Sequence, residues 1–150
     1  MSAHTDTITE ISLKSCPEYL PRIRKIAACL ADGVGMSSQE IEETTLALTE
    51  ACTNAIRHGS PRGADDSIVV KLMTSSSTLI ADVTDCGNSP ADLDTIPGKG
   101  MGMRLMRMLT NSMQIIRNGA GMTVRLTKRA GQRPRSRRVI VRRPTAVGRN

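Results

Sequence analysis

The spacing of apolar residues changes along this chain in an order that few folds can accommodate. Stretches typical of strands alternate with stretches at helical spacing, and no unit repeats. In order, the expected elements are a strand at 7–13, helices at 17–33 and 38–58, strands at 67–73 and 79–84, a loop at 85–102, a helix reaching 109, and strands at 112–117 and 122–128. Each strand pair reads as a hairpin, and helices covering one face of the sheet are the simplest layered solution. The sequence therefore predicts an α/β (α+β) fold, a two-layer sandwich with a mixed, mostly antiparallel sheet covered on one face by helices.

The longest predicted helix has signals at both ends. Ser37 or Ser38 can cap its start, with Glu40 in the first turn, and the Gly-Ser-Pro run at 59–61 ends it. Ser15 is expected to cap the helix before it.

The core must be built almost without aromatic side chains. The 150 residues include no Trp or Phe and one Tyr, Tyr19, so aliphatic residues and nine Met must fill it. A stacking platform for single-stranded nucleic acid needs aromatic faces and is therefore excluded.

The four Cys fit no metal or redox pattern, because their spacings are 13, 23 and 34 residues. Cys29 and Cys52 fall in apolar helical runs, which predicts that both are small core residues. No signal peptide or membrane-length apolar run is present. We therefore expect a cytoplasmic protein with reduced thiols and no membrane partner.

Charge is divided sharply along the chain. Residues 1–94 carry a net charge of −7, whereas residues 95–150 carry +14 and no acidic residue. This predicts a folded domain at 1–128 followed by a flexible basic tail at 129–150. Such a tail can bind phosphate backbones nonspecifically, or it can be a solvated segment that docks on an acidic partner. We do not expect direct nucleic-acid binding, because the sequence has no recognition helix or zinc pattern.

One face of the long predicted helix carries side chains suited to nucleotide chemistry. Glu50, Asn54 and His58 are spaced four residues apart and stack on that face. An amide oxygen is a suitable Mg²⁺ ligand, and a carboxylate one turn away can orient or deprotonate a nucleophile. Taken alone, the same spacing also describes an ordinary solvated helix face.

Two further motifs have a chemical and a structural interpretation each. Asp85 ends an apolar strand and Gly87 follows it, so the carboxylate can accept a hydrogen bond from adenine, or it can close a turn. The glycine run at 98–102 precedes a helix, where free amides, Lys99 and Arg104 favour a polyphosphate; alternatively, the run is a hinge. Its spacing matches neither a Walker loop nor a dinucleotide-binding fingerprint.

Taken in order, these motifs resemble the GHKL superfamily of ATP-binding domains over about residues 8–128. The segment Glu50-Ala-Cys-Thr-Asn54-Ala-Ile-Arg-His58-Gly59 is similar to the N-box of the anti-sigma-factor serine kinases, whose pattern is Glu-Ala-x-x-Asn-Ala-x-x-His-Gly. The run Gly-x-Gly-x-Gly-x-x-Leu-x-x-x-Leu from residue 98 is similar to that family's lid and the helix after it. Gly119-x-Gly121-x-Thr123-Val124 follows in the last hairpin.

The resemblance implies a Bergerat-type ATP-binding fold and a role for each matching position. By this resemblance, Glu50 is the general base and Asn54 binds Mg²⁺, while His58 shapes the site without a catalytic step. Asp85 binds the adenine amino group, and Gly87 and Thr123 line the adenine pocket. The segment that closes over the phosphates contains Gly98, Gly100 and Gly102, together with Lys99, Met101 and Arg104. One departure is Ser89, which stands where the family usually has a second glycine.

The function that this resemblance implies is that of a serine/threonine protein kinase and anti-sigma factor. Such a protein uses MgATP to phosphorylate an anti-anti-sigma protein and sequesters a sigma factor, and relatives are often homodimers. The alternative is a non-catalytic module of the same fold that acts only through protein contacts, and Ser89 keeps that alternative open. A sensor histidine kinase is not expected, because the only two histidines, His4 and His58, lie outside any dimerisation helix.

Overall fold

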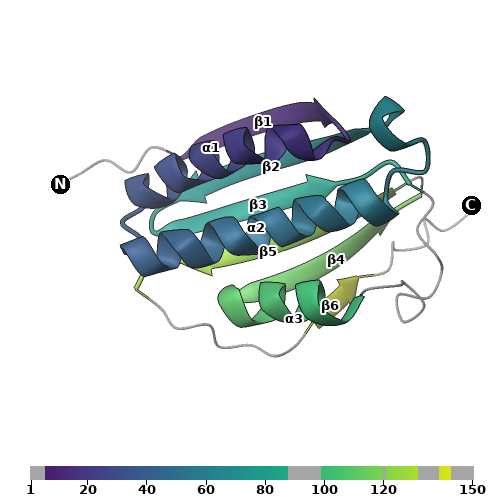
Figure 1. The fold of residues 1–150 in the computed structure, drawn as a ribbon. Coiled ribbons are helices and arrows are strands. Elements are labelled where there is room, and N and C mark those ends of the chain that lie inside the picture. Colours follow the sequence, from purple (N-terminus) through teal and green to yellow (C-terminus); the bar gives the residue numbers. More distant parts are fainter. Residues whose placement is uncertain (1–5, 88–98, 120, 132–138, 143–150) are drawn as a thin grey trace, which may run out of the picture.

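In the described part of the chain, three helices lie on one face of a six-stranded sheet (Figure 1). The computed structural model describes residues 6–87, 99–119, 121–131 and 139–142. The strands are β1 (Thr7–Lys14), β2 (Ser67–Ser75), β3 (Thr78–Thr84), β4 (Ser112–Asn118), β5 (Gly121–Arg129) and β6 (Val139–Arg142), and the helices are α1 (Leu20–Gly33), α2 (Ser38–His58) and α3 (Lys99–Leu109), with short 3-10 turns η1 (Pro17–Tyr19) and η2 (Gly63–Asp65).

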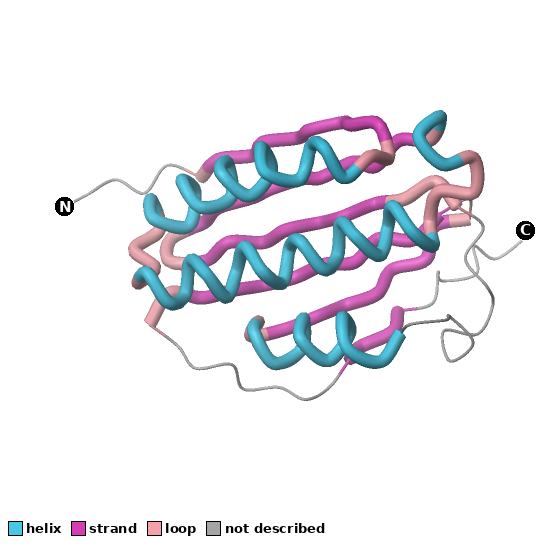
Figure 2. The backbone as a smooth tube through the Cα atoms, in the orientation of Figure 1, coloured by secondary structure: helices cyan, strands magenta, loops and turns pink. Residues whose placement is uncertain are grey.

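The strand order is β1-β2-β3-β5-β4-β6, and every neighbouring pair is antiparallel except β4 with β6. Figure 2 shows the strands side by side in one layer, with the helices on one side of it. The predicted mixed, mostly antiparallel sheet covered on one face by helices is therefore confirmed. Both predicted hairpins form, as β2–β3 and β4–β5.

The start of α2 follows from its sequence. The Ser37 hydroxyl accepts a hydrogen bond from the Glu40 amide (3.2 Å), and the Glu40 carboxylate accepts one from the Ser37 amide (2.8 Å). This capping box satisfies two amides that a helix start leaves free. The other end of α2 carries Arg57 and His58 in its last turn, followed by Gly59.

Alternating residues of the central strands form the core beneath the helices. Ile68, Val70 and Leu72 of β2 are fully buried, and their counterparts on β3, β4 and β5 are almost as well buried. From the helices, α1 and α2 contribute mainly small side chains and α3 contributes Met103 and Met106, as expected for a core without aromatic residues. None of the helices in the described part of the chain is long and apolar enough to cross a membrane.

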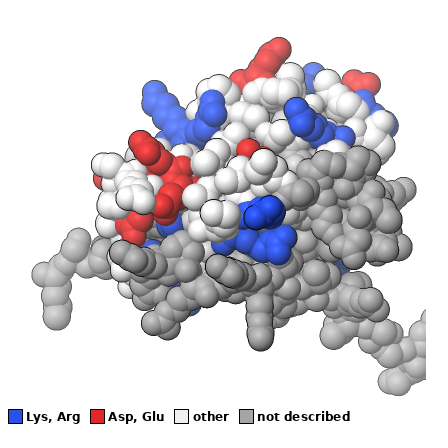
Figure 3. Space-filling model, turned by 60° about the horizontal axis from the view of Figure 1, so that its bottom comes forward, with Lys and Arg blue, Asp and Glu red and all other residues white. Residues whose placement is uncertain are grey.

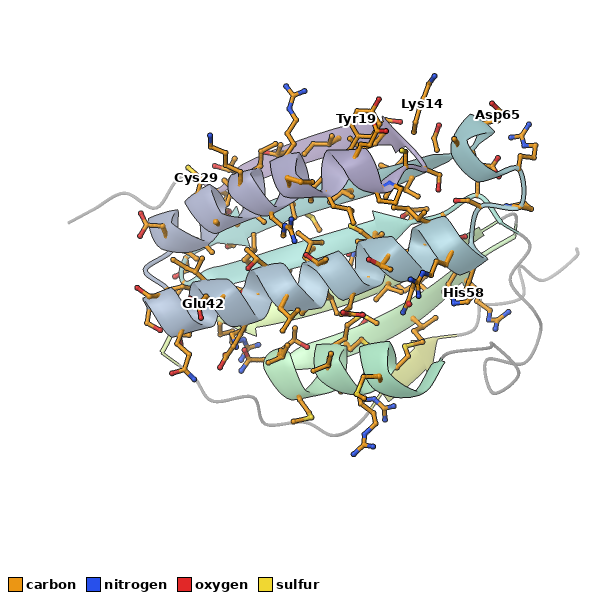
Figure 4. All side chains as sticks on the ribbon, in the orientation of Figure 1. Lys14, Tyr19, Cys29, Glu42, His58 and Asp65 are labelled. Atoms are coloured by element: carbon orange, nitrogen blue, oxygen red, sulfur yellow. The ribbon has the colours of Figure 1, made fainter. Side chains whose placement is uncertain are left out.

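Two local predictions were wrong. Ser15 caps no helix, because it is buried and its hydroxyl bonds that of Ser60. Cys29 is exposed on α1 (Figure 4), because the buried residues Ala27 and Ala31 place the core on another side of the helix. Cys52 is buried as predicted, and burial raises the pKa of its thiol to about 12.

Strand β6 was not expected, because residues 129–150 were assigned to a flexible tail. Its residues Val139 to Arg142 pair in parallel with Met113 to Ile116 of β4, so the tail prediction was wrong for this segment. The three β-branched residues at 139–141 suit a strand, and β4 would otherwise present an unpaired edge. Residues 132–138 and 143–150 of the predicted tail lie outside the described residues.

The buried ammonium group of Lys128 connects the C-terminal end of α3 to α2. The side chain of Lys128 on β5 is 2% exposed, and its ammonium group donates to the Glu43 carboxylate of α2 (2.5 Å) and to the carbonyl of Leu109 (2.7 Å). Since Leu109 is the last residue of α3, this contact fixes the C-terminal end of that helix against α2 and the sheet.

Candidate nucleotide-binding site

The polar face of α2 meets the first turn of α3. Glu50 and Asn54 are half-buried on α2, and Gly102 of α3 is buried against them. A Cβ atom on Gly102 would lie 3.0 Å from Oε2 of Glu50 and 3.5 Å from Nδ2 of Asn54. The glycine therefore lets α3 approach both polar side chains, which the resemblance had assigned to one site.

His58 lies one turn beyond Asn54 and is exposed at the end of α2 (Figure 4). It thus belongs to the same face of the helix, at the rim of the candidate site. Glu42 marks the opposite end of α2 and is also exposed.

Asp85 is a buried acid held by backbone groups. It is 5% exposed, and its Oδ1 atom accepts hydrogen bonds from the amides of Gly87 and Met122, both at 3.2 Å. Its own amide donates to the carbonyl of Met122 (3.0 Å). Burial raises the pKa of the Asp85 carboxyl to about 6, against the lowering effect of the two amides.

Three glycines allow the chain to pack closely around Asp85. A Cβ atom on Gly59 would overlap the Asp85 carboxylate, and one on Gly121 would overlap the Asp85 carbonyl oxygen. A Cβ atom on Gly87 would lie 2.6 Å from the carbonyl oxygen of Gly59. These contacts bring the end of α2 against the end of β3, so the α2 polar face and Asp85 border one region.

Two residues that adjoin Asp85 were not singled out from the sequence. Gly59 was taken as part of a helix terminator and Met122 was not selected, although both adjoin Asp85 in the structure. The position of Gly59 directly after His58 in the N-box pattern was the available signal.

Thr123 is placed differently from the expectation. Its hydroxyl pairs with that of Thr84 (2.7 Å), and the two residues are register partners. Their neighbours Val83 and Val124 are core residues beneath the helices, so Thr84 and Thr123 point to the other face of the sheet. The backbone of Met122, rather than the side chain of Thr123, lies beside the Asp85 carboxylate.

Part of the predicted glycine loop is helical. Lys99 and Gly100 begin α3, so the predicted loop extends four residues too far, and Gly98 lies outside the described residues. Met101 is 73% exposed and Arg104 is exposed, whereas Gly102 faces α2. The first turn of α3 contains no acidic residue, so its free amides and its dipole can receive an anion.

The surface charge around α3 differs from that at the start of α2. Figure 3 shows basic side chains near the middle of the face that carries α3 and acidic ones gathered at one end.

Within the residues that the structure describes, no group of three or more His, Cys, Asp or Glu could hold a metal ion. The site offers instead one amide oxygen on Asn54, and Mg²⁺ in nucleotide sites is commonly held by one or two protein oxygens together with phosphate oxygens.

A buried acid, a helix with Glu and Asn, and a glycine-bearing helix start thus meet on one face of the α+β fold. The family of histidine kinase-like ATPase domains matches residues 13–128, and the chain belongs to this family.

The curated relatives narrow the class further. A serine-protein kinase RsbW from Bacillus pumilus is 30% identical over 141 residues, covering 83% of this chain and 86% of the relative. The protein of the same name from Bacillus subtilis is 28% identical, covering 79% and 83%. These relatives support serine kinase activity for the chain, and the family implies the use of ATP.

A solved structure agrees on the fold. The crystal structure of the RsbU and RsbW domains of a Mycobacterium tuberculosis protein matches with a TM-score of 0.64 at 20% identity. The match covers 89% of this chain and 34% of that longer chain, so this protein spans about a third of it.

Proposed function

We propose that this protein binds MgATP between α2, the end of β3 and the start of α3, and transfers phosphate to a serine or threonine of an anti-anti-sigma protein. In the same proposal it is cytoplasmic and sequesters a sigma factor when that antagonist is phosphorylated. The observation that carries the catalytic part is the convergence of Glu50, Asn54 and Gly102 beside the buried Asp85. The sigma-factor part rests on the resemblance to anti-sigma-factor kinases.

Asp85 is proposed to select adenine. Its Oδ1 atom is already engaged by two amides, so Oδ2 is the atom left to accept the exocyclic amine. Oδ2 packs against Gly59, where a Cβ atom would overlap it, so the glycine keeps a side chain away from this oxygen. Gly87 allows the backbone beside the base to approach closely.

The phosphates are proposed to lie between α2 and the start of α3. The amides at 99–102 face no competing acidic side chain in the first turn of α3, and Lys99 and Arg104 add positive charge. Asn54 would hold Mg²⁺ through its amide oxygen, and the bound ion would neutralise phosphate charge. Met101, exposed at this edge, can cover the phosphates from the solvent side.

Glu50 is proposed as the general base. Its carboxylate lies on the α2 face that borders Gly102, one turn from Asn54, so it can accept the proton of a serine or threonine hydroxyl as that oxygen attacks. The helix and the close approach of Gly102 hold the carboxylate in place, which suits a reaction that depends on positioning.

The test is phosphate transfer from labelled ATP. The purified protein is incubated with Mg²⁺ and candidate anti-anti-sigma proteins, and label on the candidate is measured with a control in which its Ser and Thr acceptors are replaced by Ala. We expect label only on a protein with an intact acceptor. A partner that binds tightly but never acquires label would instead support the non-catalytic module.

We also propose a homodimer, formed through the sheet face that no described helix covers. One cross-strand row on that face carries Glu10, Lys71, Asp82 and Arg125 in register on β1, β2, β3 and β5. The signs alternate as −, +, −, +, and Asp82 and Arg125 are already paired at 2.7 Å. If a second copy of this row lies against it in reverse order, each charge meets a charge of opposite sign.

A two-fold axis parallel to the strands, between β2 and β3, would oppose every charge to one of opposite sign. Lys71 would face Asp82 of a second copy, and Glu10 would face its Arg125. Ile8, which is 68% exposed and lies on the same face of β1, would become covered.

Reversing one charge of this row should weaken the dimer. We expect Lys71→Glu to raise the dimer dissociation constant by about tenfold or more, because like charges then meet across the interface. Sedimentation equilibrium measures this, with Lys25→Glu on the exposed side of α1 as the matched control. A wild-type monomer at all concentrations, or equal effects of the two variants, would refute this interface.

A further inference from the structure

Arg117 lies near the end of β4, on the helix-covered face of the sheet. On β4, Met113 and Ile115 are core residues on the helix-covered face, and Arg117 follows at the same alternation. A connection of only two residues joins α3 to β4, and from there β4 runs toward the C-terminal end of α2 (Figure 1). The end of β4 therefore lies on the side of the molecule where α2 ends, beyond the polar face that carries Glu50 and Asn54.

The guanidinium group of Arg117 has an unsatisfied donor. Its Nη2 atom is buried, and no hydrogen-bond partner for it is present in the described part of the chain. It is the only buried side-chain nitrogen or oxygen among those residues in this condition. A buried cationic donor without a partner is costly, and such groups call for an explanation.

Two basic side chains of the neighbouring strand β5 are paired. Lys128 donates to Glu43 and to the Leu109 carbonyl, and Arg125 forms two hydrogen bonds with Asp82 at 2.7 and 2.8 Å. The Nη2 atom of Arg117 differs from both, because it is buried without a partner among the described residues. The strand partner of Arg117 is Met122, whose backbone holds Asp85, so Arg117 borders the Asp85 end of the candidate nucleotide site.

We infer that Arg117 donates hydrogen bonds to the terminal phosphates of the bound nucleotide. This inference rests on the proposed function and adds a residue to that site. An anion is the complement of an unpaired guanidinium, and phosphate matches its planar fork of donors. The first turn of α3, which bears no acid, presents amides to the same region, so helix and guanidinium bind one anion together.

If Arg117 contacts the terminal phosphates, its removal should weaken the binding of ATP and ADP more than the binding of AMP. Arg117→Met keeps an apolar stem of similar length and removes the charge and all donors. We expect it to weaken binding of ATP and ADP by roughly 10- to 100-fold, the effect of lost charge-assisted hydrogen bonds, and to change AMP binding by less than about threefold. Arg117→Lys keeps the charge without the fork and should fall between wild type and Arg117→Met.

Calorimetric titration of each variant with the three nucleotides is the experiment. Arg129→Met, at the exposed far end of β5, is the matched control and should bind like the wild type. Equal losses for ATP and AMP, or unchanged ATP affinity in Arg117→Met, would overturn this inference alone. If Arg117→Met does not fold, Arg117→Lys with wild-type ATP affinity has the same meaning. A wild-type protein that binds none of the three nucleotides would overturn the proposed function and this inference together.

Discussion

Glu50→Gln is expected to lower phosphate transfer by roughly 10²–10⁴-fold while leaving MgATP affinity close to that of the wild type. The amide keeps the size of the side chain and its place beside Gly102, but it cannot accept the proton of the attacking hydroxyl. The loss should therefore appear in the rate of transfer and not in nucleotide binding. Sigma-factor binding can persist in this variant.

Asn54→Ala should behave differently, because it removes the proposed Mg²⁺ oxygen. We expect both nucleotide affinity and transfer to fall. Paired measurements of ATP affinity and phosphate incorporation separate the two roles, with Glu42→Gln on the exposed start of α2 as the control. A Glu50→Gln protein that transfers phosphate at the wild-type rate would show that Glu50 is not the base.

Asp85→Asn is expected to weaken ATP binding by about tenfold or more and to stabilise the free protein at the same time. The carboxamide oxygen can still accept from the Gly87 and Met122 amides, which leaves an NH₂ group where Oδ2 should accept the adenine amine. Without ligand, the neutral amide avoids the cost of a buried charge. A substitution that only disturbed a turn would lower both affinity and stability.

The pH dependence follows from the raised pKa of Asp85. Because burial raises that pKa from 3.8 to about 6, protonation of Asp85 stabilises the folded protein. This contribution to the free energy of unfolding is complete below about pH 4 and is lost as the pH rises through 6. Asp85→Asn should therefore gain unfolding free energy relative to wild type across this range, by up to about 3 kcal/mol at pH 8. Denaturant unfolding at pH 4 and pH 8 measures the gain, and an equal difference at both values would contradict it.

Nucleotide affinity should respond to pH in the opposite sense. Protonation of Asp85 on Oδ2 removes the acceptor for adenine, so wild-type affinity should fall as the pH drops through about 6. The ratio of wild-type to Asp85→Asn affinity cancels the titration of ATP itself. This ratio should approach one at low pH, and a ratio independent of pH would count against adenine recognition by the Asp85 carboxylate.

The sequence predicted best what is encoded locally. The capping box of α2 lies within four residues, and the strands of both hairpins are adjacent in the chain, so spacing and turn residues identify them. The face shared by Glu50 and Asn54 follows from helix geometry alone.

What the sequence missed depends on contacts between distant segments. The overlap that a side chain on Gly59 would make with Asp85 becomes visible only when α2 is placed over β3. Strand β6 is short and embedded in an Arg-rich stretch, and only the free edge of β4 gives it a partner. Thr123 was assigned by motif, but strand alternation turns its side chain to the opposite face.

Calorimetric titration of the wild-type protein with ATP, in the presence and absence of Mg²⁺, is the decisive test of whether this protein binds MgATP. We expect saturable binding that Mg²⁺ strengthens, together with a rise in thermal stability that grows with ATP concentration, since a ligand at 100 times its dissociation constant adds about 2.7 kcal/mol. No heat of binding and no thermal shift at millimolar MgATP would contradict it.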